Sequence, residues 1–164
     1  MIAARCELLP VQPEGIPEEL KARPQWVNFE AVPRLNGRLD KVPYTPGTRR
    51  KASSTDLLTW GTFEDALAGL DHLDGVGFVF CSGDPYVGVD LDNCVDPQTG
   101  EINVWAWRII EVLDSYTEYS PTGKGVHIIV KGRTPSAVKR DEIEMYSTMR
   151  FFTITGHVIE VRLD

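Results

Sequence analysis

Hydrophobic and polar residues alternate with a period of two in several short runs of this chain, which is the pattern of β-strands. In the clearest run, residues 86–92, Val87, Val89 and Leu91 share one face, and a glycine and two aspartates share the other. Similar or wholly apolar runs predict further strands at residues 25–30, 41–45, 76–80, 116–119, 126–131, 142–146 and 151–155.

Three segments carry helical signals instead. Residues 18–22 suit a short helix after a proline-rich start, and Thr62 with Asp65 is typical of the cap that begins a helix over residues 63–70. Residues 104–113 have the helical period. Their apolar stripe, expected to pack on the sheet, consists of Trp105, Ile109 and Val112. Helices among hairpins predict an α+β fold: a mixed, largely antiparallel sheet with flanking helices.

The length of 164 residues suits a single domain. We expect an irregular arm and a short helix over residues 1–24, and the core over residues 25–164. The sequence Ser-Gly-Asp-Pro at residues 82–85 joins two apolar runs and predicts a hairpin between the strands at 76–80 and 86–91.

The composition, 42% hydrophobic and 25% charged, is that of an ordinary globular protein. No apolar stretch approaches the roughly 20 residues that span a bilayer, and no signal segment opens the chain. We therefore expect a cytoplasmic protein with no membrane partner. Cys6, Cys81 and Cys94 are odd in number and widely spaced, which favours free, mostly buried thiols over disulfides or a zinc site.

The net charge of −7 opposes nucleic-acid binding by charge alone. Basic residues nevertheless gather in residues 34–51 and again in residues 124–140. Two interpretations of the first segment stay open: simple solvation, or a surface that follows phosphate groups.

Asp90 and Asp92 are the most informative residues. Two carboxylates two residues apart on a strand lie side by side and repel each other. A divalent cation with oxygen ligands relieves that repulsion, whereas an exposed strand face leaves both groups simply hydrated. The rest of the chain decides between these alternatives.

Three further segments place polar groups on the strand faces opposite the core. His127 points outward from residues 126–131, and Glu144 and Tyr146 point outward from residues 142–146. Residues 120–125, Ser-Pro-Thr-Gly-Lys-Gly, form a loop whose glycines permit positive φ and whose lysine can meet an anion. Taken alone, each of these groups is commonly just a hydrated part of the protein surface. Together they are the components of metal-assisted phosphoryl transfer.

Other catalytic signatures are missing from the sequence. Residues 120–125 lack the upstream glycine and the final Ser or Thr of a Walker A loop. The chain has no G-x-S-x-G elbow, no H-E-x-x-H helix and no paired-cysteine zinc signature.

These motifs resemble the catalytic core of the archaeo-eukaryotic primase superfamily, in particular the phage- and plasmid-type primase-polymerases. Val-Asp-Leu-Asp at residues 89–92 is similar to the first motif, and residues 120–127, ending in His127, are similar to the second. Residues 143–146, followed by 150–156, resemble the third motif. The resemblance covers residues 25–157 and includes two upstream runs, 41–44 and 51–60. It departs from the family in a short link between residues 131 and 144, and in Met149, where the family often has Gly.

The resemblance implies an RRM-like core that transfers nucleotides to a 3′-hydroxyl on a DNA template, in replication of a phage, plasmid or other mobile element. It implies two Mg²⁺ or Mn²⁺ ions held by Asp90, Asp92 and Glu144, with His127 in the catalytic set. The residues expected to bind the nucleotide are Ser120, Gly123, Lys124, Gly125, His127, Tyr146 and Arg150. Those expected to touch DNA are Lys41, Arg49, Arg50, Lys51, Ser53 and Ser54.

The expected partners are a single-stranded template with its primer, and nucleoside triphosphates. We expect the chain to be a core excised from a longer protein that also carries a helical accessory domain or a helicase. Two other functions stay open on the sequence: a non-catalytic single-strand or origin DNA-binding module of a replication initiator, and a metal-dependent nuclease.

Overall fold

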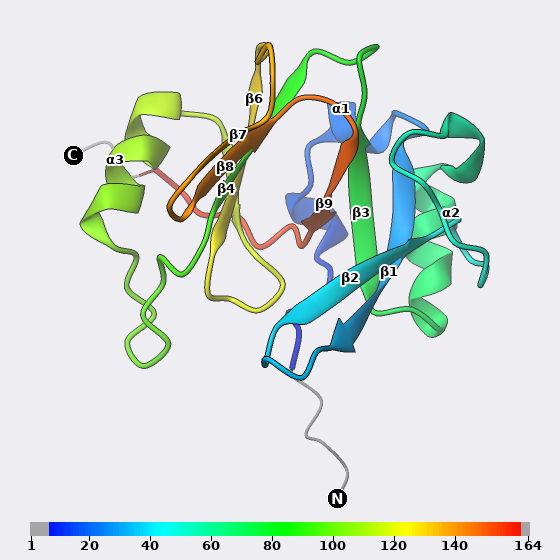
Figure 1. The fold of residues 1–164 in the computed structure, drawn as a ribbon, viewed down its shortest axis with the longest axis horizontal. Helices are drawn as coiled ribbons and strands as arrows, with labels where there is room; N and C mark the ends of the chain where they lie inside the picture. The colour runs from blue at the N-terminus through cyan, green and yellow to red at the C-terminus, as the bar shows by residue number, and fades with distance from the viewer. Residues whose placement is uncertain (1–6, 162–164) are drawn as a thin grey trace, which may run out of the picture.

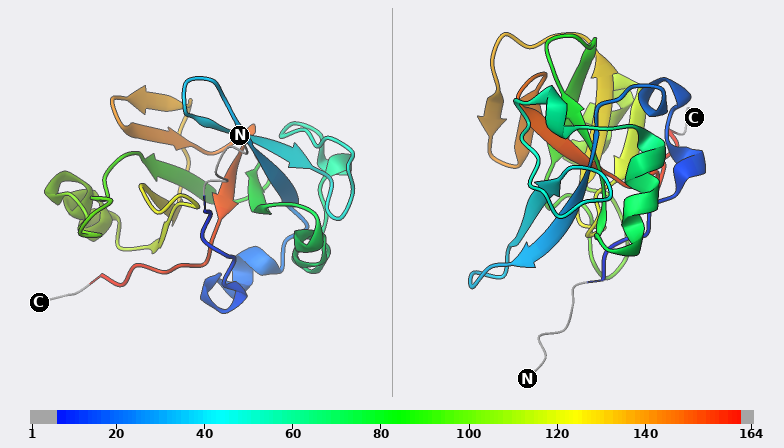
Figure 2. Two further views of the ribbon diagram at one scale, coloured as in Figure 1. Left: turned by 90° about the horizontal axis from the view of Figure 1, so that it is seen from below. Right: turned by 90° about the vertical axis from the view of Figure 1, so that its right-hand side faces the viewer.

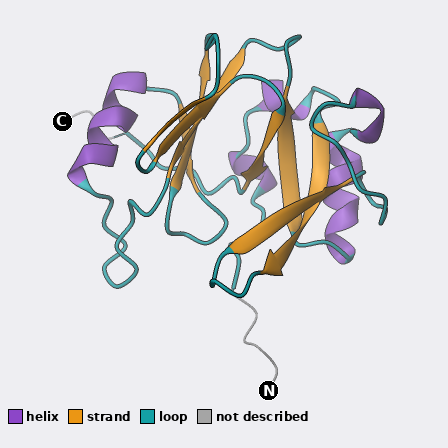
Figure 3. Cartoon of the chain, in the orientation of Figure 1, coloured by secondary structure: helices purple, strands orange, loops and turns teal. Residues whose placement is uncertain are grey.

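The computed structural model describes residues 7–161, in which the strands form two antiparallel sheets and helices are few (Figures 1 and 3). The four-stranded sheet has the order β2-β1-β3-β9, and the five-stranded sheet has the order β5-β6-β4-β8-β7. Cys6 and the first residues of the expected N-terminal arm lie outside the described residues.

The four-stranded sheet contains β1 (Trp26–Pro33), β2 (Leu39–Tyr44), β3 (Gly75–Phe80) and β9 (Arg150–Ile154). The five-stranded sheet contains β4 (Tyr86–Leu91), β5 (Tyr116–Tyr119), β6 (Val126–Lys131), β7 (Val138–Arg140) and β8 (Ile143–Tyr146). The helices are α1 (Glu18–Lys21), α2 (Phe63–Ala68) and α3 (Val104–Leu113), with 3₁₀ turns at Pro13–Gly15, Leu57–Thr59 and Gly69–Asp71.

The predicted α+β class is confirmed, but the strands lie in two sheets rather than one, and the hairpin predicted between residues 76–80 and 86–91 is wrong. β3 belongs to the four-stranded sheet and β4 to the five-stranded sheet. The carboxylate of Asp84, 2% exposed, accepts hydrogen bonds from the Cys81 and Tyr86 amides and from the side chain of Gln25. These bonds fix the turn so that the chain crosses from one sheet to the other.

Helix α3 covers one face of the five-stranded sheet (Figures 1 and 2). Its ends are those predicted, and Ala106 and Ile110 are buried in the core cluster that includes Val87, Val89 and Leu91. The predicted stripe was partly wrong, because Val112 is 83% exposed. The buried face of the helix instead passes through residues 106 and 110, which lie one turn apart.

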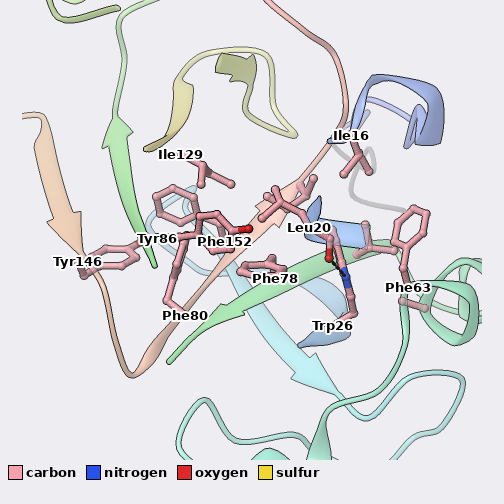
Figure 4. Packing of buried hydrophobic residues seen from close by; sticks show 13 residues of the cluster. Ile16, Leu20, Trp26, Phe63, Phe78, Phe80, Tyr86, Ile129, Tyr146 and Phe152 are labelled. Atoms are coloured by element: carbon pink, nitrogen blue, oxygen red, sulfur yellow. Dashed lines mark hydrogen bonds between the residues drawn. The ribbon is translucent and has the colours of Figure 1, made fainter. Parts of the chain in front are cut away.

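The opposite face of the five-stranded sheet packs on the four-stranded sheet, whereas the sequence predicted an open surface. Phe80 and Phe152 of the four-stranded sheet contact Tyr146 of the five-stranded sheet edge to face, as Figure 4 shows. Gly88 permits this close approach, since a Cβ atom there would lie 2.6 Å from Cζ of Phe152. His127, predicted to point outward, is therefore only 3% exposed.

The same aromatic core extends to the short helices. Trp26 stacks at a tilt on Phe63 of α2, with ring centroids 4.8 Å apart, and its indole N–H donates to the Leu20 carbonyl of α1 (Figure 4). Thr62 caps α2 as predicted, accepting a hydrogen bond from the Asp65 amide. These contacts hold both short helices against β1 of the four-stranded sheet.

Among residues 7–161 no helix is long and apolar enough to cross a membrane. Cys81 and Cys94 are free thiols, as predicted, and Cys94 is buried.

Candidate active site

Five residues, one from each strand of the five-stranded sheet, face one another in register across the sheet. Reading from β5 to β7, this cross-strand row consists of Glu118, His127, Asp90, Glu144 and Lys139. Residues directly opposite one another on paired strands project from the same face, with neighbouring Cα atoms about 4.5–5.5 Å apart. The pairing therefore brings together the first carboxylate, the histidine and the third carboxylate that the sequence singled out.

The row faces a cleft between the two sheets, with a volume of about 510 Å³. Asp90, His127, Lys139, Glu144 and Tyr146 line it from the five-stranded sheet. From the other wall it is lined by Lys41, Ser54 and the β9 residues Arg150, Phe151, Phe152 and Thr153. Carboxylates thus occupy one wall, and cationic side chains lie around the rim.

One ion pair partly balances the charges in the row, since Nζ of Lys139 lies 2.9 Å from a carboxylate oxygen of Glu144. Nε2 of His127 lies 3.6 Å from a carboxylate oxygen of Asp90. Within residues 7–161, no three His, Cys, Asp or Glu side chains are grouped so that they could hold a metal ion. Glu144 is engaged with Lys139 in this arrangement.

Asp92 lies just beyond the end of β4, where its amide donates to the carbonyl of Glu142. The side chain is exposed, yet its pKa is raised above the ordinary value by partial desolvation and by the negative charges of Asp90 and Glu144. The three predicted metal ligands therefore lie near enough to repel one another.

The raised pKa of Asp92 gives a pH-dependent prediction for stability. The folded state holds the Asp92 proton to a higher pH than the unfolded chain does, so wild-type stability falls as pH rises through that window. We expect Asp92→Asn, measured with EDTA present, to be more stable than the wild type, by a margin that grows from acid to neutral pH. Urea unfolding at a series of pH values checks this; a margin that shrinks with rising pH would contradict it.

Tyr146 forms part of the cleft wall but is more buried than the sequence indicated, at 9% exposed. Burial, followed by the charges of Asp90 and Glu144, raises the pKa of Tyr146, so the phenol stays protonated. The guanidinium of Arg150 lies over the Tyr146 ring, 5.8 Å from its centroid, while the Arg150 side chain remains exposed at the cleft rim.

The loop at residues 120–125 lies beside the end of β4. Gly125 abuts the backbone there, since a Cβ atom on it would lie 2.8 Å from the Leu91 carbonyl oxygen. Gly123 has φ +73°, as its predicted role in the turn requires. The Ser120 hydroxyl accepts from the Gly125 amide at 3.1 Å and so closes the loop. None of these described loop residues, Lys124 included, lines the cleft, so their role in nucleotide binding stays a prediction.

Of the six residues predicted to touch DNA, two line the cleft and four do not. Lys41 and Ser54 line the cleft, and the Ser54 hydroxyl donates to the carbonyl of Met149, which precedes β9. Arg49 pairs with Glu30 and lies over the Tyr44 ring, away from the cleft. The remaining three, Arg50, Lys51 and Ser53, are not among the residues that line the cleft in the described chain.

Sequence reasoning missed three residues of this site: Glu118, Lys139 and Thr153. Glu118 and Lys139 complete the cross-strand row, and the buried Thr153 hydroxyl, at the cleft wall, has no hydrogen-bond partner among the described residues. A charged residue between Thr117 and Tyr119 in a predicted strand was the available signal for Glu118. The short, exposed β7 gave none for Lys139.

The fold and the cleft define an α+β protein with a charged site between two antiparallel sheets, to which each of the three motifs of the sequence contributes at least one lining residue. No family model matches the chain. The chain is 38% identical, over 149 residues, to a DNA primase-polymerase of Nitratiruptor phage NrS-1. The match covers 85% of this chain and 20% of the relative, so this chain spans about a fifth of the phage protein's length. The chain is a homologue of this PrimPol-type primase, which confirms the resemblance found in the motifs.

Proposed function

We propose that this chain is the catalytic core of a template-dependent nucleotidyltransferase that extends a primer 3′-hydroxyl with nucleoside triphosphates and releases pyrophosphate. The observation that carries the proposal is the register of β6, β4 and β8, which aligns His127, Asp90 and Glu144 along one cleft. The relation to a phage primase-polymerase supports a role in the replication of a phage or another mobile element.

The donor set suits Mg²⁺ or Mn²⁺, because Asp90, Asp92 and Glu144 offer only carboxylate oxygens. Their mutual repulsion, which raises the pKa of Asp92, would be relieved by positive charge. Two such ions would activate the attacking hydroxyl and neutralise charge on the triphosphate. For Glu144 to join the other two carboxylates, its side chain has to turn away from Lys139.

The chain's own residues supply the rest of the nucleotide site. Arg150 and Lys41 at the rim offer charge-assisted hydrogen bonds to phosphate oxygens, and His127 presents Nε2 to the same space. The unpartnered hydroxyl of Thr153 is a further polar contact for a bound nucleotide. A volume of about 510 Å³ lies within the range of small-molecule sites. Tyr146 in the wall would bias the choice between ribose and deoxyribose.

The remaining predicted contacts belong to the template and to the phosphates. Ser120, Gly123, Lys124 and Gly125 would meet the triphosphate from the adjacent loop. The basic segment that contains Lys41 and residues 49–54 would follow the template strand, with a single-stranded DNA template and its primer as partners.

Primer extension tests the proposal. The purified chain is mixed with a labelled primer–template, each nucleotide type in turn, and Mg²⁺ or Mn²⁺; we expect an extended primer and equimolar pyrophosphate. DNA binding without extension would overturn the proposal in favour of a non-catalytic binding module. Shortening of the primer with no nucleotide present would instead indicate a nuclease.

The ion pair between Lys139 and Glu144 leads to a prediction about metal affinity. Lys139 competes with a metal ion for the Glu144 carboxylate, so we expect Lys139→Met to bind Mn²⁺ a few-fold more tightly than the wild type. Isothermal titration calorimetry measures the affinity without any need for enzymatic activity. Lys131→Met is the matched control, since Lys131 lies on β6 of the same sheet but outside the row, where it pairs with Glu19 of α1. Equal or weaker Mn²⁺ binding by Lys139→Met would contradict the prediction.

A further inference from the structure

Glu118 is a fully buried carboxylate that joins the two sheets. It lies on β5 and is 0% exposed, and it accepts hydrogen bonds from the backbone amides of Thr155 and Gly156 at 2.9–3.1 Å. Those two residues follow β9 of the four-stranded sheet. The Tyr116 hydroxyl donates to the same carboxylate at 2.6 Å. Glu118 thus connects the five-stranded sheet to the segment that follows β9 of the four-stranded sheet.

The fourth partner of Glu118 is His127. Nδ1 of the imidazole lies 3.3 Å from Oε1 of Glu118, and Nε2 lies on the opposite side, 3.6 Å from Asp90. The ring also stacks on Phe152, with centroids 4.7 Å apart and planes 21° from parallel. One ring nitrogen is therefore anchored in the interior, while the other is directed at the cleft.

A neutral acceptor could also accept the hydrogen bonds from the two backbone amides, so those bonds alone do not explain a carboxylate at this position. A buried carboxylate is costly, and this one is stabilised only because every partner around it can donate. The amides of Thr155 and Gly156 and the Tyr116 hydroxyl are donors, and burial beside Glu118 raises the pKa of Tyr116, which keeps its proton in place. An acceptor in these surroundings selects the form of His127 whose Nδ1 carries a proton.

We propose that Glu118 is a positioning residue: it holds the His127 ring by its Nδ1–H, so that Nε2 stays directed into the cleft toward the triphosphate of a bound nucleotide. This inference rests on the proposed function for the identity of the ligand, but the Glu118–His127 pair itself is independent of it. For histidines that ligate a metal, partners that orient the ring through its second nitrogen commonly contribute about 10- to 100-fold to affinity or activity, and we expect an effect of that order here.

Nitrogen-15 NMR of His127 in the wild-type chain, without nucleotide, is the first test. We expect Nδ1 to be protonated and hydrogen-bonded at neutral pH, and a bare Nδ1 would overturn the inference. This measurement requires neither a variant nor enzymatic activity. A wild type that shows the expected Nδ1 signal but extends no primer would overturn the proposed function and leave the positioning role standing.

Glu118→Gln is the second test. It places an amide NH₂ group where Oε1 accepted from His127, so a donor replaces the acceptor that faces Nδ1. We expect loss of the Nδ1 proton signal and a rise of about 10-fold or more in KM for the nucleotide, with a smaller change in kcat. Tyr116→Phe is the matched control, since it removes a hydrogen bond from the same carboxylate without touching His127. It should keep the wild-type His127 signals and KM. Unchanged His127 signals and KM in Glu118→Gln would overturn the inference.

Discussion

Asp90→Ala is expected to abolish primer extension while leaving the fold intact. Asp90 occupies the centre of the cross-strand row, with His127 opposite it on one side and Glu144 on the other. Glu118 lies at one end of the row, and Glu144 lies between Asp90 and the cation Lys139. Loss of a metal-ligand carboxylate removes several kcal/mol of transition-state stabilisation, and ~4 kcal/mol corresponds to a rate about 10³-fold lower.

The fold should survive this change because Asp90 is not a stabilising group. Its side chain is 20% exposed, and it lies beside two other carboxylates whose repulsion its removal relieves. Among residues 7–161, the side-chain contact that the change removes is a long one, 3.6 Å to Nε2 of His127. We therefore expect a melting temperature equal to or above that of the wild type, measured by circular dichroism.

Glu142→Gln is the control for Asp90→Ala. Glu142 precedes β8, and its carboxylate accepts a hydrogen bond from Asn93, so the change removes a nearby negative charge without touching the row. Its primer-extension rate should stay near that of the wild type. Extension by a folded Asp90→Ala protein at a rate close to the wild type would show that the row is not the catalytic centre.

The local features of this protein were predictable from its sequence. The alternation in residues 86–92 correctly assigned Val87, Val89 and Leu91 to the core and Asp90 to the opposite face. Helix α3 begins and ends at the predicted residues, and Thr62 caps α2. Each of these follows from residues a few positions apart, where periodicity and capping chemistry act directly.

The pairing of the strands was not predictable in the same way. β3 is buried on both faces, so its apolar run does not indicate which strands flank it, and the predicted hairpin with β4 was wrong. β7 is exposed throughout and carries no alternation. Glu118 is tolerated in the interior only because residues 155 and 156, far along the chain, donate to it. Such compensation arises from tertiary structure and leaves no local pattern.

Phe152→Ala is expected to cause a large loss of stability. Phe152 is 2% exposed and lies where the two sheets meet, in contact with Phe80, Tyr146 and the His127 ring. Removing a buried phenylalanine costs about 3–5 kcal/mol, because the transfer free energy is lost and a cavity remains. That is a large part of the ~5–15 kcal/mol that stabilises a typical domain. Urea unfolding measures the change.

Phe78→Ala separates a general loss of packing from a specific effect on the site. Phe78 is fully buried in the same aromatic cluster, where it contacts Trp26, Phe80 and Tyr86 but is not stacked on His127. Both variants should lose similar stability, whereas only Phe152→Ala should shift the ring signals of His127, which lose the stacked aromatic ring. If either variant is unfolded at room temperature, Phe152→Leu and Phe78→Leu replace the two Ala variants, because they remove fewer buried atoms and lose less stability. A Phe152 variant with unmoved His127 signals would mean that the two sheets do not meet at His127. The His127 ring would then lack the aromatic wall that is expected to help hold its Nε2 in position.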